Sequence, residues 1–506
     1  MRQLALLFAL AITCLVAPLH GDETSDAIRG LLEADTWSSL SIGGQHIHDP
    51  GDLVAVYQDR DYAPVWVSDP ARLRALLGVL DGAESHGLRR GDYHYKSIAE
   101  RAGLSLTGSA AAELELLASD AFLTYALHLG RGKVTEERIA DWNIDRPDVD
   151  LRARLVRAAK GDPAASIADL LPRNPGYDRL REALERYRSI AGEGGWKPLS
   201  GGASLRASDH GAGGAALRKR LGITGDLAPD AGNAFDDSLD AAVRRFQSRN
   251  GLDPDGVVGP ATRAALNVPV AKRIEQITIN LERWRWLKAD LGERYVLVNI
   301  AGFNAGLYDD DRLTLGMRAI VGKPYRRTPI FSDDIRYIVF SPYWNIPSSI
   351  AHDEILPKGT DYMRQHDIEV LPSGRLRQLP GPENALGRVK FMFPNRFSVY
   401  LHDTPARELF KQTSRSFSHG CIRLAKPLQL AEELLRNQGW TMEKVESAVE
   451  RSSPLTVNLE KSVPVHILYW TAWVDESGTV QFRHDVYGRD GAVSRALRER
   501  PDGKGE

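Results

Sequence analysis

The segment Tyr400–Pro427, which reads YLHDTPARELFKQTSRSFSHGCIRLAKP, brings two histidines close to a cysteine. The residues SVYLH, positions 398–402, overlap its start and are typical of a β-strand that ends at His402. The residues PLQLAEELLRNQGW, which begin at its end, predict a helix from about Pro427. Cys421 therefore lies in a short segment between strand-rich chain and a helix, where Gly420 allows a tight backbone turn.

The N-terminus has the form of a secretory signal peptide, which we predict over residues 1–21. Arg2 is followed by the apolar run Leu4–Ala17, which is too short to span a bilayer comfortably, and the alternative is a buried N-terminal helix. Removal of a signal peptide would take Cys14 with it and leave Cys421 without an intramolecular disulfide partner. Such a thiol in an exported protein is buried and inert, paired to another chain, or used for chemistry.

Length and composition indicate a globular protein of two to four domains. The chain has 506 residues, of which 42% are hydrophobic and 26% charged, and its formal net charge is -2. A nucleic-acid-binding protein would need a basic patch, so this balance argues against nucleic acid as a partner. No later stretch approaches membrane-spanning length, and we expect no stable membrane insertion.

The N-terminal region, residues 22–192, is predicted to be a helical scaffold domain. Apolar residues recur there at helical spacing: Leu73, Leu76, Leu77 and Leu80; Leu116, Leu123 and Leu127; Tyr177, Leu180, Leu184 and Tyr187. It shows no metal-ligand spacing and no catalytic constellation. Residues 193–214 are rich in Gly and Ser and predict a flexible linker or long loop.

Residues 215–267 form a compact unit of helices. One helix has Leu239, Val243 and Phe246 on a single face, and Pro260 suits the first position of the next. The stretch AVRRFQSRNGLDPDGVVGPATRAAL resembles the small three-helix peptidoglycan-binding domain of cell-wall enzymes. That resemblance implies a glycan-binding surface between the helices. A connecting helix is expected over residues 268–290.

Residues 291–470 are predicted to form a mostly-β domain. RYVLVNI, IRYIVF, RVKFMF and SVYLH are rich in β-branched and aromatic residues, and Val389 and Phe391 alternate with Lys390. The polar stretch 348–382, rich in Pro and Gly, interrupts these strands and is interpreted as a cap over a site. Residues 471–506 form a C-terminal extension that we expect to be disordered past about Arg489.

Chemistry at Cys421 requires the thiolate, and a histidine that takes the proton provides it. His419 is two residues away, and His402 lies at a strand end from which a loop can fold back; spacing alone does not choose between them. Two other interpretations are a zinc site built from His402, Asp403, His419 and Cys421, and an inert buried cysteine. Structural zinc sites usually show two pairs of ligands at spacings such as C-x2-4-C or H-x3-5-H, which this segment lacks.

The pattern H-x15-S-H-G-C-I-R resembles the signature of the L,D-transpeptidase (YkuD-type) family. The segments SPYWNIPSSIA, PGPENALGRVKFMFPN and VYLHDTP are similar to its large Gram-negative branch, which joins a helical scaffold, a peptidoglycan-binding domain and a capped catalytic domain. The resemblance therefore implies a multidomain α+β protein with a helical scaffold, a small three-helix domain and a mostly-β catalytic domain.

By matched position, the resemblance implies that Cys421 is the nucleophile and His402 the proton acceptor and donor. The backbone carbonyl of Asp403 would orient the imidazole, and the N–H groups of Gly420 and Cys421 would face the oxyanion. Ser418 and His419 would shape the site.

Further substrate contacts are expected from two arginines and from the end of the SPYWN strand. Arg423 departs from the Asn common across the wider family, and we expect it to bind a substrate carboxylate, with Arg388 as a second candidate. Trp344 and Asn345 line the pocket in one interpretation, whereas Trp344 is core packing in the other. We expect no metal and no organic cofactor.

The reaction that the resemblance implies is acyl transfer on peptidoglycan stem peptides in the periplasm. Cys421 would attack the carbonyl of a meso-diaminopimelate residue, release D-alanine and pass the acyl group to a second stem as a 3→3 cross-link. An L,D-carboxypeptidase or endopeptidase would use the same residues with water as the acceptor. A noncatalytic wall-binding scaffold is the third alternative. Glycan and other cell-wall synthases are the further candidate partners.

Overall fold

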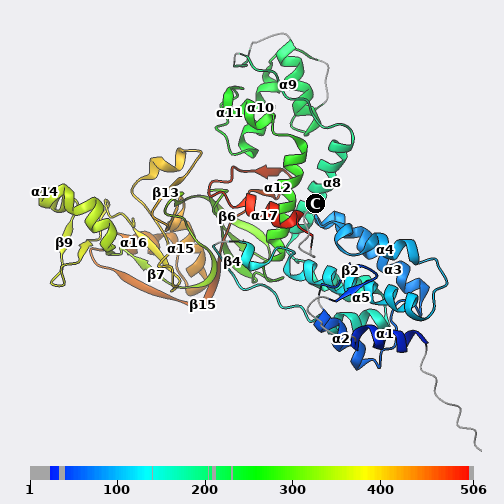
Figure 1. The fold of residues 1–506 in the computed structure, drawn as a ribbon. Coiled ribbons are helices and arrows are strands. Elements are labelled where there is room, and N and C mark those ends of the chain that lie inside the picture. Colours follow the sequence, from blue (N-terminus) through cyan, green and yellow to red (C-terminus); the bar gives the residue numbers. More distant parts are fainter. Residues whose placement is uncertain are drawn as a thin grey trace, which may run out of the picture. The chain divides into compact units, whose positions relative to one another are not determined.

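The computed structural model describes residues 23–33, 40–48, 50–139, 141–202, 204–207, 212–228 and 232–500. The chain divides into two compact units (Figure 1). The first comprises residues up to Asp81, Arg90–Tyr125 and Asp150–Ser166, and the second holds the remainder. The predicted signal peptide, with Cys14, lies outside the described residues. No helix of the described part is long and apolar enough to cross a membrane.

The first unit is helical, as predicted for a scaffold. Its elements are α1 (Glu23–Glu33), the hairpin β1 (Ser41–Ile42) and β2 (Gln45–His46), α2 (Pro50–Asp59), α3 (Pro70–Asp81), η3 (Arg90–Asp92), α4 (Tyr95–Arg101), the first part of α5 (Gly108–Arg131), α6 (Leu151–Lys160) and most of α7 (Pro163–Ile167). Buried Glu115 on α5 accepts the backbone N–H groups of residues 65–67 at 2.6, 2.8 and 2.9 Å. The loop after α2 is thereby fixed to α5, since a buried carboxylate needs such donors.

The two compact units do not follow the domain boundary expected at residue 192. Residues 82–89, 126–149 and 167–192 belong to the second unit, where α8 (Pro175–Gly192) packs against α12 (Val270–Arg285). The reason is a shared core: Tyr177, Leu180 and Leu184 of α8 bury against Ile277 and Leu281 of α12. Three short helical turns also fall in this part, η2 (Gly82–His86), η4 (Glu136–Arg138) and η5 (Ala168–Leu170).

The expected flexible linker is partly fixed in place. Leu205 pairs with Val258 through two backbone hydrogen bonds of 3.4 and 2.8 Å, and Trp196 Nε1 donates to Val268 O at 2.9 Å. Residues 203 and 208–211 of this stretch lie outside the described part. The Gly/Ser content therefore did not predict the two ends of the segment, which pack on their neighbours.

The small three-helix unit has the predicted elements, α9 (Ala212–Ile223), α10 (Asp237–Arg249) and α11 (Pro260–Leu266). Asp236 caps α10 by accepting the Leu239 N–H at 3.0 Å, and Pro260 begins α11 as predicted. The core contains the apolar face expected from the sequence, including Leu239, Val243 and Phe246.

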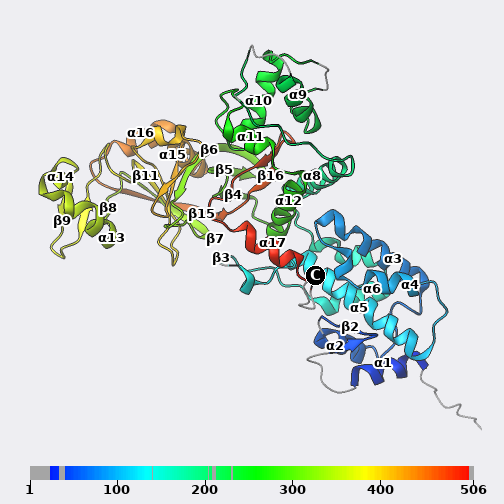
Figure 2. The ribbon, with the colours of Figure 1, turned by 45° about the horizontal axis from the view of Figure 1, so that its top comes forward.

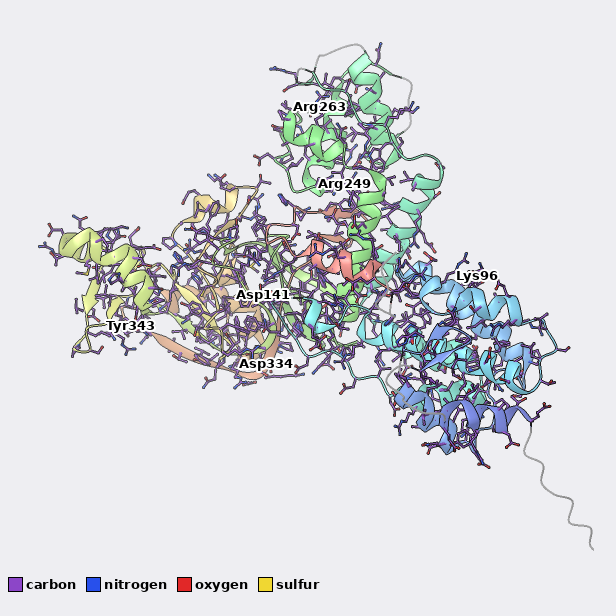
Figure 3. The ribbon with its side chains drawn as sticks, viewed as in Figure 1. Lys96, Asp141, Arg249, Arg263, Asp334 and Tyr343 are labelled. Atoms are coloured by element: carbon purple, nitrogen blue, oxygen red, sulfur yellow. The ribbon has the colours of Figure 1, made fainter. Side chains whose placement is uncertain are left out.

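A buried ion pair stabilises this small unit. The side chains of Arg249 (Figure 3) and Asp226 are 7% and 4% exposed and form a two-bond contact. Asp226→Ala leaves the guanidinium buried without its partner and should cost about 3–5 kcal/mol of unfolding free energy. The matched control is Asp240→Ala, which removes the more exposed Arg244–Asp240 pair and should cost about 1 kcal/mol or less. Urea unfolding followed by circular dichroism measures both, and equal effects would contradict the prediction.

The C-terminal domain is built on a sheet that closes on itself. Its main strands are β4 (Arg294–Asn299), β5 (Asn304–Asp309), β6 (Arg312–Gly322), β7 (Ile330–Phe340), β11 (Val389–Met392), β12 (Leu401–His402), β14 (Ile422–Leu424) and β15 (Leu455–Leu468). The order β11-β12-β14-β6-β5-β4-β15-β7 returns to β11 through the β7–β11 pairing. Two shorter strands add to it, β3 (Trp142–Asn143) on β7 and β13 (Ser416–Ser418) on β6.

Two helices cover this sheet, α15 (Pro427–Leu435) and α16 (Met442–Val449), beside β7 and β15 in Figure 1. α15 begins at Pro427, as predicted, and buries Leu430, Ala431 and Leu434 in the main core. The turns η8 (Arg407–Lys411) and η9 (Arg436–Gln438) complete this part.

The polar insert forms a small subdomain with its own core (Figure 2). It contains the strands β8 (Trp344–Asn345), β9 (Ile368–Val370) and β10 (Leu376–Gln378), in the order β8-β10-β9, and the helices α13 (Ser348–Ile350), η6 (Ala351–Ile355), η7 (Leu356–Lys358) and α14 (Gly359–Gln365). It begins at β8, slightly before the predicted cap 348–382.

The predicted disorder past Arg489 is wrong for residues 490–498. This stretch forms α17 (Asp490–Arg498), which follows the hairpin β16 (Ala472–Val474) and β17 (Val480–Phe482). Val493 and Leu497 bury in a cluster with Ile279 and Trp286, and Asp490 pairs with Arg283 at 2.7 Å. Although residues 490–498 are rich in charge, they form an amphipathic helix, and its apolar face packs against α12. Residues 501–506 lie outside the described part.

Candidate active site

Cys421 lies in a tight excursion between two strands that both pair with β6. β13 runs parallel to β6 with Ser418 opposite Gly322, and β14 runs antiparallel to it with Arg423 opposite Ile320. Between Ser418 and Arg423 the pairing with β6 changes from parallel to antiparallel, so the chain must turn sharply. Gly420 has φ of 120° at this turn, a backbone conformation that favours glycine. Cys421 is partly exposed at this turn and is a free thiol.

Hydrogen bonds fix the turn on both sides. Ser418 Oγ donates to Cys421 O at 2.5 Å and accepts from Gly420 N at 3.1 Å. Thr328 Oγ1 donates to Gly420 O at 2.8 Å, and Thr328 N donates to the hydroxyl of Tyr487 at 3.2 Å. Ser418 thus supports the turn from within, and the C-terminal extension supports it through Tyr487.

The Gly420 amide is not free to act as an oxyanion donor in this state, which corrects the expectation for it. Its N–H is engaged by Ser418 Oγ. The Cys421 amide has no hydrogen-bond acceptor among the described residues. Of the two predicted donors, Cys421 N–H is therefore the one available to a developing negative charge.

His402 ends β12, where parallel pairing with β14 sets it opposite Arg423. Its side chain is buried, with the Tyr400 ring 5.6 Å away, centroid to centroid. Burial, the positive charge of Arg423 and the nearby Lys390 lower the pKa of His402 to about 3, although the backbone at Asp403 and Leu386 favours the protonated ring. The imidazole is therefore neutral near neutral pH.

The backbone of Asp403 acts on the His402 ring in the direction expected of an orienting carbonyl, because it favours the protonated imidazole. Within the described residues, His402 Nδ1 is buried and makes no hydrogen bond of standard geometry. The Asp403 carboxylate accepts Arg388 N at 3.0 Å and the Arg407 guanidinium at 3.0 Å. These two bonds fix the backbone next to His402.

The sulfur of Cys421 lies 3.8 Å from Ser398 O, to which it donates, and also contacts the backbone and hydroxyl of Tyr400. It makes no hydrogen bond to an imidazole of the described chain. Burial raises the pKa of the Cys421 thiol, whereas contacts with Tyr400 and the charges of Lys390 and Arg423 act in the opposite direction. Since the His402 pKa is about 3, the proton stays on sulfur in the resting state. The thiolate must form as the substrate is attacked, with neutral His402 able to accept the proton.

Lys390 and Tyr400 are site residues that the sequence interpretation missed. Lys390 lies opposite His402 on β11, and its Nζ is 3.7 Å from the centroid of the Tyr400 ring. Both had a signal: Lys390 is the polar member of the alternation in RVKFMF, and Tyr400 precedes His402 by two residues, on the same face of an extended strand. Their positive and phenolic groups act on the thiol.

Arg423 lies where a carboxylate-binding residue is useful. Its Nε is buried and has no hydrogen-bond partner in the described chain, while its charge interacts with Cys421 and His402. A buried donor without an acceptor is costly, and a ligand carboxylate would supply the acceptor. Arg388, by contrast, is 48% exposed with Nε 3.8 Å from Asp403, so part of its charge is already paired.

The remaining predicted residues belong to the cap and its contact with the turn. His419 Nε2 is 2.7 Å from Glu354 Oε1 of the cap, an ion pair whenever His419 is protonated. Trp344 packs against the cap core on β8, which supports the core-packing interpretation, and Asn345 is exposed on the same strand. Tyr343, labelled in Figure 3, is the residue before this strand, and the guanidinium of Arg377 stacks over its ring at 4.1 Å from the centroid.

His402, Asp403, His419 and Cys421 do not converge as metal ligands in the part of the chain that the structure describes. Their ring and carboxylate atoms are engaged separately, His419 with the cap and Asp403 with two arginines. The zinc interpretation of this segment therefore has no geometric support.

Arg423→Gln should slow the reaction of Cys421 with iodoacetamide at mildly alkaline pH. The Arg423 charge lowers the thiol pKa against the effect of burial, so its removal moves the pKa further up and reduces the thiolate fraction. The measurement is the alkylation rate against pH, whose midpoint should shift to higher pH. Arg388→Gln is the matched control and should leave the profile unchanged; a shift in the control but not in Arg423→Gln would contradict this electrostatic account.

Three family profiles match the chain in separate regions. Residues 51–184 match a scaffold domain, residues 212–266 a "putative peptidoglycan binding domain", and residues 293–465 the L,D-transpeptidase catalytic domain (YkuD). The mostly-β C-terminal domain with its SHGC turn thus matches the L,D-transpeptidase catalytic-domain (YkuD) family. The order of the three matches, scaffold, peptidoglycan-binding and YkuD, is the one that the sequence pattern predicted.

A curated relative agrees with the catalytic-domain match. A "Putative L,D-transpeptidase" from Haemophilus influenzae is 32% identical over 224 residues, covering 40% of this chain and 45% of the relative. The match therefore spans less than half the length of that relative.

Solved structures of the same description were also found. An L,D-transpeptidase from Mycobacterium smegmatis is 17% identical, covers 35% of this chain and 58% of its own, and has a TM-score of 0.20. One from Stackebrandtia nassauensis is 13% identical, covers 54% and 97%, and scores 0.23.

Proposed function

We propose that this protein is a periplasmic peptidoglycan L,D-transpeptidase that forms 3→3 cross-links through a thioester on Cys421. The observation that carries the proposal is the set of groups around the thiol: a partly exposed cysteine, the buried Arg423 Nε, which has no hydrogen-bond partner in the described chain, and the neutral imidazole of His402. The L,D-transpeptidase catalytic domain supports the reaction class. The domain match at residues 212–266 supports peptidoglycan as the substrate.

The proposed reaction begins when the carboxylate of a stem peptide binds Arg423. The negative charge offsets the Arg423 effect on His402 and so raises the proton affinity of the imidazole. His402 then takes the thiol proton as sulfur attacks the meso-diaminopimelate carbonyl, and Cys421 N–H stabilises the oxyanion. D-Alanine leaves with the proton from His402, and the amine of a second stem resolves the thioester.

Export fits this proposal. Peptidoglycan lies outside the cytoplasm, and the signal peptide predicted over residues 1–21 would deliver the chain there. The small unit with α9–α11 would hold glycan near the catalytic domain, and other cell-wall synthases are candidate partners. In the alternative, an L,D-carboxypeptidase or endopeptidase, water would resolve the same thioester.

Muropeptide analysis distinguishes these functions. Cells that express the protein should gain 3→3 dimers, and cells that express Cys421→Ala should not. Shortened stems without new dimers would instead indicate the hydrolase, and no change in either strain would contradict both enzymatic functions. Immunoblotting confirms equal amounts of the two proteins.

A further inference from the structure

Three side chains that are distant in sequence meet in the first unit. His48 follows the hairpin β1–β2, His94 immediately precedes α4, and Asp120 lies on α5 (β2, α4 and α5 are labelled in Figure 2). His48 Nδ1 is 2.5 Å and His94 Nε2 is 2.7 Å from the same oxygen, Asp120 Oδ2. One ligand-type atom from each residue lies within 4.8 Å of the others.

The group is shielded from water. The side chains of Asp120, His94 and His48 are 1%, 7% and 11% exposed. A buried carboxylate needs hydrogen-bond donors or a cation next to it, and two ring nitrogens converge on Asp120 Oδ2.

Neighbouring groups orient the three side chains in the way that outer partners orient metal ligands. Asp120 Oδ1 accepts a hydrogen bond from the backbone N–H of His48 at 2.8 Å, which leaves Oδ2 to face the two imidazole rings. Gln45 Oε1 is 3.4 Å from His94 Nδ1, so the far nitrogen of that ring faces an acceptor. Ligating imidazoles usually donate their second N–H to such an acceptor.

We propose that His48 Nδ1, His94 Nε2 and Asp120 Oδ2 bind one Zn²⁺ ion. Two imidazoles and a carboxylate form a common three-residue zinc set, and a water or His46, whose ring lies 6.0 Å from that of His48, would take the fourth position. Zinc–ligand bonds near 2.1 Å separate tetrahedral ligand atoms by roughly 3.3 Å, so small side-chain rotations would admit the ion. The expectation of no metal site in the scaffold rested on sequence spacing, which cannot reveal this convergence.

The proposed ion is a cross-link for the N-terminal hairpin. The strands β1 and β2 have two residues each, too few to hold an isolated hairpin together. Neither cysteine of the chain lies within residues 40–125, so no disulfide can attach the hairpin. Zinc would tie it to α4 and α5, and its binding energy would add to the stability of the fold.

The test uses the full-length Cys421→Ser protein, so that the thiol cannot bind metal. The protein is stripped with EDTA and titrated with ZnCl₂ by isothermal titration calorimetry, with melting temperature as a second readout. We expect one ion per chain and a higher melting temperature with zinc. A fitted stoichiometry below 0.1 zinc ion per chain (about one ion in ten chains) would overturn the proposal.

Two ligand variants and one control locate the ion. His48→Gln and His94→Asn should each weaken zinc binding by about 100-fold or more, as loss of a ligand costs at least as much as loss of an outer partner. Asn is chosen because His94 has φ of 50°, which Asn tolerates. His352→Ala removes a histidine that lies 3.5 Å from an acidic side chain elsewhere and should have no effect.

Unchanged affinity in both ligand variants would overturn the proposal. Because a variant that misfolds also loses binding, a zinc-edge anomalous difference map of crystals of the Cys421→Ser protein gives an independent answer. A peak between His48, His94 and Asp120 supports the site, and a map with no peak there contradicts it. Neither readout depends on catalytic activity.

Discussion

Cys421→Ser should abolish covalent acylation of the protein by a carbapenem, which the L,D-transpeptidase family typically accepts as an acyl donor. Loss of the nucleophile should lower the acylation rate by about 10⁴-fold or more, because oxygen in the same place is a far weaker nucleophile without a stronger base. His402, with its pKa of about 3, is not such a base. Intact-protein mass spectrometry should show one adduct on the wild type and none on the variant.

Serine closely matches cysteine in size, so the Cys421→Ser variant should keep its melting temperature. Ser414→Ala, an exposed change in the same segment, is the control and should acylate at the wild-type rate. An adduct on both the wild type and Cys421→Ser would show that another residue is acylated. That result would remove the basis for the proposed mechanism.

His402→Ala should lower the acylation rate by about 10²–10⁴-fold, the usual contribution of a general base. The buried ring lies on the strand next to the segment that carries Cys421, and it is neutral and ready to accept a proton. Stopped-flow fluorescence of carbapenem acylation measures the rate. His419→Ala, which removes a ring bound to the cap, is the matched control and should have a much smaller effect.

The pH dependence of acylation tests the same assignment. The second-order acylation rate constant, measured below saturation, reports the free enzyme, in which the His402 pKa is about 3. His402 then stays unprotonated as pH falls from about 7 to 5, so protonation of this base should not reduce the rate constant there. A decline centred near the ordinary histidine pKa would point to a more exposed imidazole. If His419→Ala abolishes acylation while His402→Ala does not, His402 is not the base.

The local pattern of the chain predicted much of the catalytic sheet. The β-branched and aromatic runs became β4, β7, β11 and β12, and the helix expected from Pro427 is α15. His402 falls at the end of β12, and Cys421 lies just before β14, as their positions between predicted elements required. These elements are encoded by short-range periodicity, which sequence displays directly.

Features that depend on distant partners were not predictable. The amphipathic α17 is stable because α12 offers it an apolar surface, and Tyr487 supports the catalytic turn from far along the chain. The hydrogen bond from Gly420 N–H to Ser418 Oγ depends on the rotamer of Ser418, which a sequence motif does not specify. Lys390 had a visible signal in its strand alternation, but only the pairing with β12 sets it opposite His402.

The cap illustrates the same limit. Its polar, Pro- and Gly-rich composition indicated an insert, and the structure gives that insert a separate core and an ion pair from Glu354 to His419. The composition did not reveal which cap residue meets the catalytic turn. That contact joins residues 65 positions apart.

The most direct test of the account is to trap the acyl-enzyme from a natural donor. The wild-type protein is incubated with a disaccharide tetrapeptide, quenched in acid and mapped by tandem mass spectrometry. We predict a donor lacking its terminal D-alanine, attached to the peptide that contains Cys421 and released by hydroxylamine, as a thioester must be. Release of D-alanine with the donor attached to a different residue, or with no covalent intermediate while Cys421 is unmodified, would contradict the account.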